Sequence, residues 1–195
     1  IGGETAEMPG TYAEDDYDLA GFIVGAMDKQ RILPRPDVSA GDVLIGLPSL
    51  GLHTNGYSLA RKVLLEKMGL RVSDRPAGLP VTVGEALLAP HRSYLNALWP
   101  ELERNRIKAL VHITGGGFEG NIPRVLPPGV GARVDTGAWQ IPPIFNLIAE
   151  GGPVARDEMF RTFNMGIGMI LVVSTAAAAE VEDSLRSRGE TCFRI

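Results

Sequence analysis

The sequence predicts an α/β fold (α+β in its local order): a layered α/β/α domain with a mixed β-sheet. Three short apolar runs rich in β-branched residues carry this prediction, at residues 42–47, 107–113 and 167–173. Segments with helical spacing lie between the runs. Because strands and helices mix without strict alternation, we expect a mixed sheet rather than a doubly wound parallel one.

The composition is that of a folded globular chain with an excess of glycine and proline. The 195 residues include 24 glycines and 14 prolines, with 45% hydrophobic and 22% charged residues. Ordinary values for the last two exclude a disordered tail, and no apolar run approaches the roughly 20 residues of a membrane span. A net charge of −4 argues against nucleic acid as a partner. The single cysteine, Cys192, cannot form an internal disulfide, which favours a reducing, cytoplasmic location.

The first 35 residues are predicted to be distinct from the rest. Residues 19–27 form an apolar run that predicts a buried strand, and the prolines and mixed charges of residues 31–42 are typical of a linker. We therefore expect a boundary near residue 35, with segments 1–35 and 36–195. Since Ile1 leads directly into the site-like sequence Gly2–Thr5, we also expect the chain to be a piece of a larger protein.

The second segment continues with helices. The first is predicted over 58–68, where leucines and a valine recur at helical spacing and Gly69 provides a stop. The last is predicted over 176–188, after the N-cap candidates Ser174 and Thr175 and before Gly189. The helices expected between them span residues 83–88, 93–104 with a kink at Pro100, 118–125, 144–150 and 157–162.

The strongest local signal for chemistry is His112-Ile-Thr-Gly-Gly-Gly117. Three glycines after an apolar strand allow several backbone N–H groups to converge on an anion, and Thr114 adds a hydroxyl. The pattern favours phosphate binding by Thr114, Gly115, Gly116 and Gly117. A turn without a ligand is the alternative, because the spacing does not fit the better-known phosphate loops.

A second candidate is the turn Gly51-Leu-His-Thr-Asn-Gly56. His53, Thr54 and Asn55 supply an imidazole, a hydroxyl and an amide between a strand and a helix N-terminus. The alternative for His53 is an ordinary hydrogen-bonded surface residue.

The remaining candidates are weaker on residue type alone. Glu4 and Glu7 could hold a hard cation such as Mg²⁺ or lie on a solvated surface. Asn164 could bind a ligand amide or satisfy a buried backbone group. His91, after Pro90, is assigned a capping or surface role.

Six motifs in register resemble the phosphoribosylformylglycinamidine cyclo-ligase family, also called aminoimidazole ribonucleotide synthetases. They span essentially the whole chain, at residues 2–10, 17–22, 41–46, 51–62, 112–127 and 161–168. The resemblance implies ATP-dependent closure of formylglycinamidine ribonucleotide to aminoimidazole ribonucleotide, with release of ADP and phosphate, in purine biosynthesis. ATP would phosphorylate the formyl amide oxygen, and an amidine nitrogen would then attack the activated carbon. Mg²⁺ is the implied metal, as in other phosphoryl transfers.

The resemblance also assigns roles to residues. His53, Asn55 and His112 would be catalytic. The implied ATP and substrate contacts are Gly3, Glu4, Thr5, Thr54, Gly56, Thr114, Gly115, Gly116, Gly117, Asn121 and Asn164. Glu4 would also contact the metal. Thr54 stands where the family usually has serine, which keeps the hydroxyl.

The family resemblance implies that part of the enzyme is absent from this chain. Family members have an N-terminal ATP-binding domain, and the chain begins near its final strands, so residues 1–35 would be its remnant. The family dimerises largely through N-terminal strands, which makes a homodimer the expectation for the full enzyme and inactivity the expectation for this chain alone. The alternatives are a formylglycinamidine ribonucleotide synthetase, thiamine monophosphate kinase or selenophosphate synthase type, or a noncatalytic module that binds a phosphorylated ligand.

Overall fold

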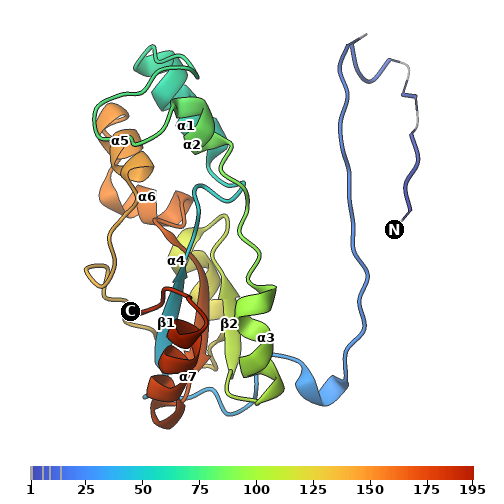
Figure 1. The fold of residues 1–195 in the computed structure, drawn as a ribbon, viewed down its shortest axis with the longest axis vertical. Helices are drawn as coiled ribbons and strands as arrows, with labels where there is room; N and C mark the ends of the chain where they lie inside the picture. Colours follow the sequence, from blue (N-terminus) through green and yellow to red (C-terminus); the bar gives the residue numbers. More distant parts are fainter. Residues whose placement is uncertain (1, 6, 9, 14) are drawn as a thin grey trace. The chain divides into compact units, whose positions relative to one another are not determined.

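The computed structural model describes residues 2–5, 7–8, 10–13 and 15–195. Its internal contacts divide the chain into two units, Ile1–Ile32 and Leu33–Ile195 (Figure 1). Each unit is described by itself.

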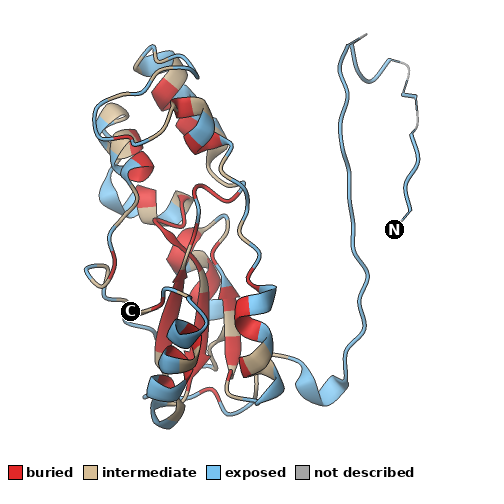
Figure 2. Ribbon diagram, viewed as in Figure 1, coloured by how far each residue is buried: buried red, intermediate tan, exposed pale blue. Residues whose placement is uncertain are grey.

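The first unit contains one regular element among its described residues, the short 3₁₀ helix η1 (Lys29–Arg31). The strand predicted over 19–27 is wrong: these residues form neither strand nor helix and are exposed (Figure 2). Phe22 and Ile23 are 95% and 96% exposed. A strand requires a partner strand for its backbone hydrogen bonds, and no described residue of this unit supplies one.

The second unit is built on a four-stranded sheet of order β2-β3-β1-β4. The strands are β1 (Val43–Pro48), β2 (Ala109–His112), β3 (Ile167–Val173) and the two-residue β4 (Phe193–Arg194). The predicted α/β class is confirmed, but each of the three described pairings is antiparallel, where a mixed sheet was expected. The reason is that β1 and β2, which run in the same direction, are separated by β3 and never pair.

Side chains on the two faces of this sheet enter different cores. Ile45 and Leu171 lie in a cluster with Leu98 of α3 (Leu95–Glu103) and Val181 of α7 (Thr175–Ser187). Figure 1 shows both helices beside the sheet.

Leu44, Ile170 and Val172 point into the other core, which includes Phe118 of α4 (Gly117–Asn121) and Ile122 of η3 (Ile122–Val125). The alternation along each strand therefore covers the sheet on both faces, as the layered prediction requires.

The second core continues into the remaining helices. Helix α1 (Tyr57–Arg61) runs directly into the π-helical η2 (Lys62–Lys67), and both fall within the helix predicted at 58–68 to within one residue. The others are α2 (Val83–Leu87), α5 (Pro143–Gly151) and α6 (Arg156–Thr162). In the described part of the chain, no helix is long and apolar enough to cross a membrane.

Candidate functional site

The loops that follow β1 and β2 meet at one edge of the sheet. Because both strands run antiparallel to β3, their carboxyl ends, Pro48 and His112, lie at the same end of the sheet on either side of the start of β3. Asn55 joins the two loops: its Nδ2 donates to Thr114 Oγ1 at 2.8 Å, and its Oδ1 accepts from the Gly115 N–H at 3.0 Å. The structure thus brings together the two motifs that sequence analysis singled out.

The glycine loop is a tightly held turn. Asn121 Nδ2 donates to the Gly117 carbonyl at 2.7 Å and also reaches the carbonyls of Thr114 and Gly115 at 3.3 Å. The Gly117 N–H donates to the Thr114 carbonyl at 3.0 Å. Since the N–H of Gly115 is bound to Asn55, two of the loop amides are already hydrogen-bonded within the protein.

Two of the three glycines are required by geometry. Gly116 and Gly117 have φ of +91° and +57°, and a Cβ on Gly117 would lie 1.7 Å from the Phe160 carbonyl oxygen. Gly115 has no positive φ, and a Cβ there would lie 3.4 Å from Asn55 Oδ1, an ordinary contact. Backbone geometry therefore explains Gly116 and Gly117, while Gly115 is free of that demand.

His53 is a fully buried imidazole held by backbone donors. Its Nε2 accepts from the N–H of Leu50 at 3.1 Å and of Arg92 at 3.3 Å. Burial, with the positive charges of nearby groups, lowers the pKa of His53 to about 4. Nε2 therefore carries a lone pair and the proton is on Nδ1, which has no hydrogen-bond partner among the described residues. Both His53 and Thr54 have left-handed backbones, with φ of +52° and +63°.

All three histidines of the chain gather here. The His91 ring stacks on His53 with centroids 4.2 Å apart and planes 20° from parallel, and the centroid of the His112 ring lies 5.2 Å from that of His91. Partial burial and the neighbouring His91 lower the pKa of His112. The sequence assignment of His91 to a capping or surface role missed this cluster; the signal available was that the chain has only three histidines.

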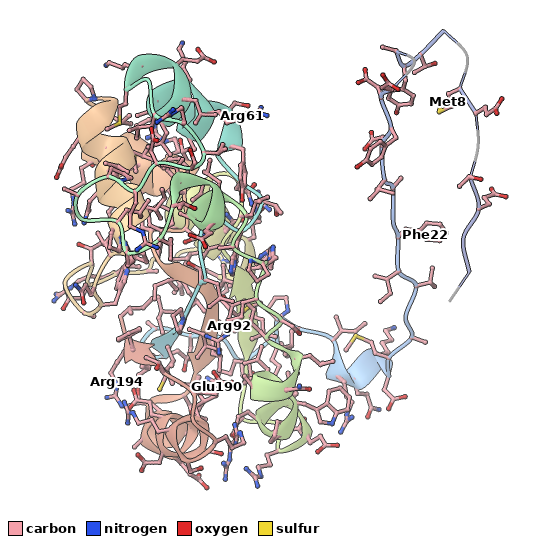
Figure 3. The ribbon with its side chains drawn as sticks, turned by 45° about the horizontal axis from the view of Figure 1, so that its top comes forward. Met8, Phe22, Arg61, Arg92, Glu190 and Arg194 are labelled. Atoms are coloured by element: carbon pink, nitrogen blue, oxygen red, sulfur yellow. The ribbon has the colours of Figure 1, made fainter. Side chains whose placement is uncertain are left out.

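Polar residues around β1 and β3 fix the histidine cluster. The guanidinium of Arg92 donates to the Pro48 carbonyl at 3.0 Å and pairs with Glu190, and Figure 3 shows these two side chains close to one another. Tyr94 Oη donates to the same carbonyl at 2.9 Å, and burial raises the pKa of Tyr94 to about 12. A Cβ on Gly168 would lie 2.2 Å from Tyr94 Oη, so β3 makes room for this packing by lacking a side chain there.

Asn164 and Gly56 lie in the supporting structure of the same loop. Asn164 Oδ1 accepts from Ser49 Oγ and the Gly166 N–H, and its Nδ2 donates to the Gly51 carbonyl, each at 2.8 Å. Gly56 precedes α1 with φ of +73°, and a Cβ there would lie 2.2 Å from the ring of Phe163. The buried amide of Asn164 is therefore used to hold the loop, the second of the two roles weighed for it.

Gly3, Glu4 and Thr5 belong to the first unit, where they are exposed. Within the described ranges, no group of three or more histidine, cysteine, aspartate or glutamate side chains could hold a metal ion. Among the described residues, Glu4 thus offers a single carboxylate and is not part of a preformed set of metal ligands.

Fold and site together define the class: a layered α/β domain whose polar residues gather where two strands of an antiparallel sheet end. Residues 39–195 match the family model described as AIR synthase related protein, C-terminal domain. The chain belongs to this family, as the sequence motifs implied.

The curated relatives it resembles are phosphoribosylformylglycinamidine cyclo-ligases. Those of Shouchella clausii, Geobacillus kaustophilus and Sorangium cellulosum are 52%, 51% and 52% identical to it over 195 residues. The matches cover 100%, 100% and 99% of this chain but 56% of each relative. The chain therefore spans little more than half the length of these enzymes.

Proposed function

We propose that this chain is the C-terminal part of a cytoplasmic phosphoribosylformylglycinamidine cyclo-ligase. The enzyme would convert formylglycinamidine ribonucleotide and ATP to aminoimidazole ribonucleotide, ADP and phosphate in purine biosynthesis. About 50% identity along the entire chain to enzymes of that name supports the proposal. The remainder of the ATP site, and the homodimer, would come from the part of the enzyme that this chain does not span.

The observation that carries the proposal is the junction of the two loops through Asn55. It places the Thr114 hydroxyl and the exposed Gly115 beside the loop that bears His53. We assign the ribose phosphate of the substrate to Thr114–Gly117, where the Thr114 hydroxyl and a backbone N–H can donate hydrogen bonds to a phosphate oxygen. His112, exposed at the end of β2, would interact with the reacting groups, and Asn121 holds the loop in shape.

The nucleotide side is assigned to Gly3, Glu4 and Thr5, with Glu4 as a ligand of Mg²⁺. Mg²⁺ commonly takes one or two carboxylates together with phosphate oxygens and water, so one carboxylate from Glu4 suits that chemistry only when other ligands complete the shell. When bound, the metal would neutralise charge on the transferring phosphoryl group. The residues of this chain bind and orient the substrate.

Calorimetric titration of the 195-residue chain tests the proposal. We expect formylglycinamidine ribonucleotide to bind, ATP with Mg²⁺ not to bind measurably, and no ATP-dependent turnover. Replacing Thr114 with valine should weaken substrate binding at least tenfold, while Ser187→Ala, which removes a hydroxyl from the exposed end of α7, should leave it unchanged. Failure of the substrate to bind would overturn the substrate assignment, and turnover by the chain alone would overturn its dependence on a further part.

A further inference from the structure

His91 covers one face of the buried His53 ring. The two imidazoles are stacked at 4.2 Å, yet His53 is 0% exposed whereas His91 is exposed. We infer that His91 is a positioning residue of the site, whose ring keeps water from His53 and so holds that imidazole neutral and fixed as a hydrogen-bond acceptor.

The neutral state of His53 matters for the local structure. Its Nε2 accepts two backbone N–H groups, from Leu50 in its own loop and from Arg92 in the segment that carries His91. An imidazolium has a proton on each nitrogen and cannot accept either bond. Protonation of His53 would therefore break both bonds: the bond to Leu50 within the loop and the bond to Arg92 that links the loop to the segment carrying His91.

The backbone at this position adds a reason for an external support. His53 and Thr54 both adopt left-handed conformations, which cost free energy for residues other than glycine and persist only where the surroundings hold them. The stacked ring of His91 is one such constraint, and the two hydrogen bonds to Nε2 are another.

The charged and titratable groups that face His53 come from three elements. His91 and Arg92 lie in the segment before α3, Tyr94 is its N-cap, and His112 ends β2. Glu190, which follows α7, pairs with Arg92 and offsets its charge. Desolvation is the largest influence that lowers the pKa of His53, ahead of the charges of His91, His112 and Arg92. Removing the ring that excludes water should therefore have a greater effect than removing a charge.

Two substitutions of His91 distinguish the exclusion of water by its ring from the effect of its charge. His91→Ala removes both, while His91→Phe retains an aromatic ring without a charge; His112→Ala is the matched control, because it removes a nearby imidazole whose only described stacking neighbour is His91. The titration of the His53 Cε1 proton is followed by NMR in the full chain, together with hydrogen exchange at the amides of Leu50 and Arg92. Thermal melting confirms that each variant is folded.

We expect the His53 midpoint to rise from about 4 toward 6.5 in His91→Ala, with exchange at Leu50 and Arg92 accelerated at least tenfold at pH 6. In His91→Phe and His112→Ala the midpoint should stay well below 6.5. An unchanged midpoint in His91→Ala, or an equal rise in His91→Phe, would overturn the inference. The inference rests on the proposed function only in treating His53 as a site residue, and since the titration uses no substrate, either can fail without the other.

Discussion

Asn55 and Thr114 are joined by a 2.8 Å hydrogen bond from Nδ2 to Oγ1, although they lie 59 positions apart in the sequence. The bond connects the loop after β1 to the loop after β2. With the Gly115 N–H bound to Asn55 Oδ1, a single amide side chain determines the relative position of the histidine loop and the glycine loop.

Asn55→Ala should lower both stability and substrate affinity. Loss of two loop-joining bonds is expected to reduce the free energy of unfolding by about 1–2 kcal/mol. Urea unfolding and calorimetry with formylglycinamidine ribonucleotide measure the two effects. Asn55→Asp keeps an acceptor for the Gly115 N–H but adds a negative charge, so it should lose affinity with less loss of stability. Wild-type affinity in both variants would contradict the role assigned to Asn55.

Gly117→Ala and Gly115→Ala should differ sharply. Alanine at position 117 meets the Phe160 carbonyl oxygen and a left-handed backbone, so the free energy of unfolding should fall by about 3 kcal/mol or more. Alanine at position 115 makes an ordinary contact and should leave the midpoint of urea unfolding nearly unchanged while reducing phosphate-ester affinity. If Gly115→Ala binds substrate as well as wild type, the exposed Gly115 does not face the phosphate.

The free energy of unfolding should decrease as the pH is lowered from about 6.5 to about 4. The pKa of His53 is about 4 in the folded chain and 6.5 in an ordinary imidazole, so in this window the unfolded chain binds a proton that the folded chain does not. The stability that the neutral His53 contributes is fully present above pH 6.5 and is lost as the pH falls toward 4. Urea unfolding across pH 4–7 measures the slope, and His53→Gln, which can accept a hydrogen bond but cannot titrate, should be flatter. Equal slopes would show that other groups cause the loss.

Glu101→Gln should be strongly destabilising. This carboxylate is fully buried between α3 and α7 and accepts from Ser184, Arg106 and Arg188. Burial alone would raise the pKa of Glu101, but these hydrogen bonds outweigh it and the pKa lies below its usual value. Neutralising it replaces charge-assisted hydrogen bonds from Arg106 and Arg188 with those of a buried neutral amide, which we expect to cost about 1.5–3 kcal/mol.

The control for Glu101 is Glu180→Gln. Glu180 also pairs with Arg106, but its side chain is 64% exposed, so its loss should change the free energy of unfolding by less than about 1 kcal/mol. Equal effects of the two substitutions would mean that burial does not set the strength of this network.

The double substitution of Phe22 and Ile23 by aspartate should reduce self-association of the isolated chain. Both side chains are more than 90% exposed in an apolar run, a feature that promotes association between chains. Light scattering at increasing concentration gives the average mass. Two charges in the run should shift it toward the monomer, and an unchanged mass would place the contact elsewhere.

Much of the fold could be predicted because its signals are local. The strand at 167–173 and the cap at Ser174 are observed as expected, since an apolar β-branched run and an N-cap serine act within a few residues. Strand β4 was not foreseen, because its two residues are a strand only by virtue of pairing with Ile45 and Gly46. The antiparallel order of the sheet is likewise a property of distant segments.

The candidate site also has residues that the local sequence identifies and residues that only the fold brings to it. The motifs around His53 and Thr114 are recognisable from residue type and spacing, and the structure brings them together. His91 could not be placed in the cluster from its neighbours, since Pro90 and Arg92 say nothing of a ring 38 positions earlier. The failed strand at 19–27 shows the converse: an apolar run reports a tendency to be covered, not what covers it.

Gly168 limits how the site can be re-engineered. The space that a side chain at this position would need is filled by the Tyr94 hydroxyl and the edge of the His53 ring, both within 2.9 Å of where a Cβ would lie. Gly168 therefore cannot be substituted to reshape the site from the β3 side. Libraries that vary this strand should keep glycine at position 168. Diversity is better introduced at exposed positions such as Thr54, where a new side chain displaces solvent rather than a packed ring.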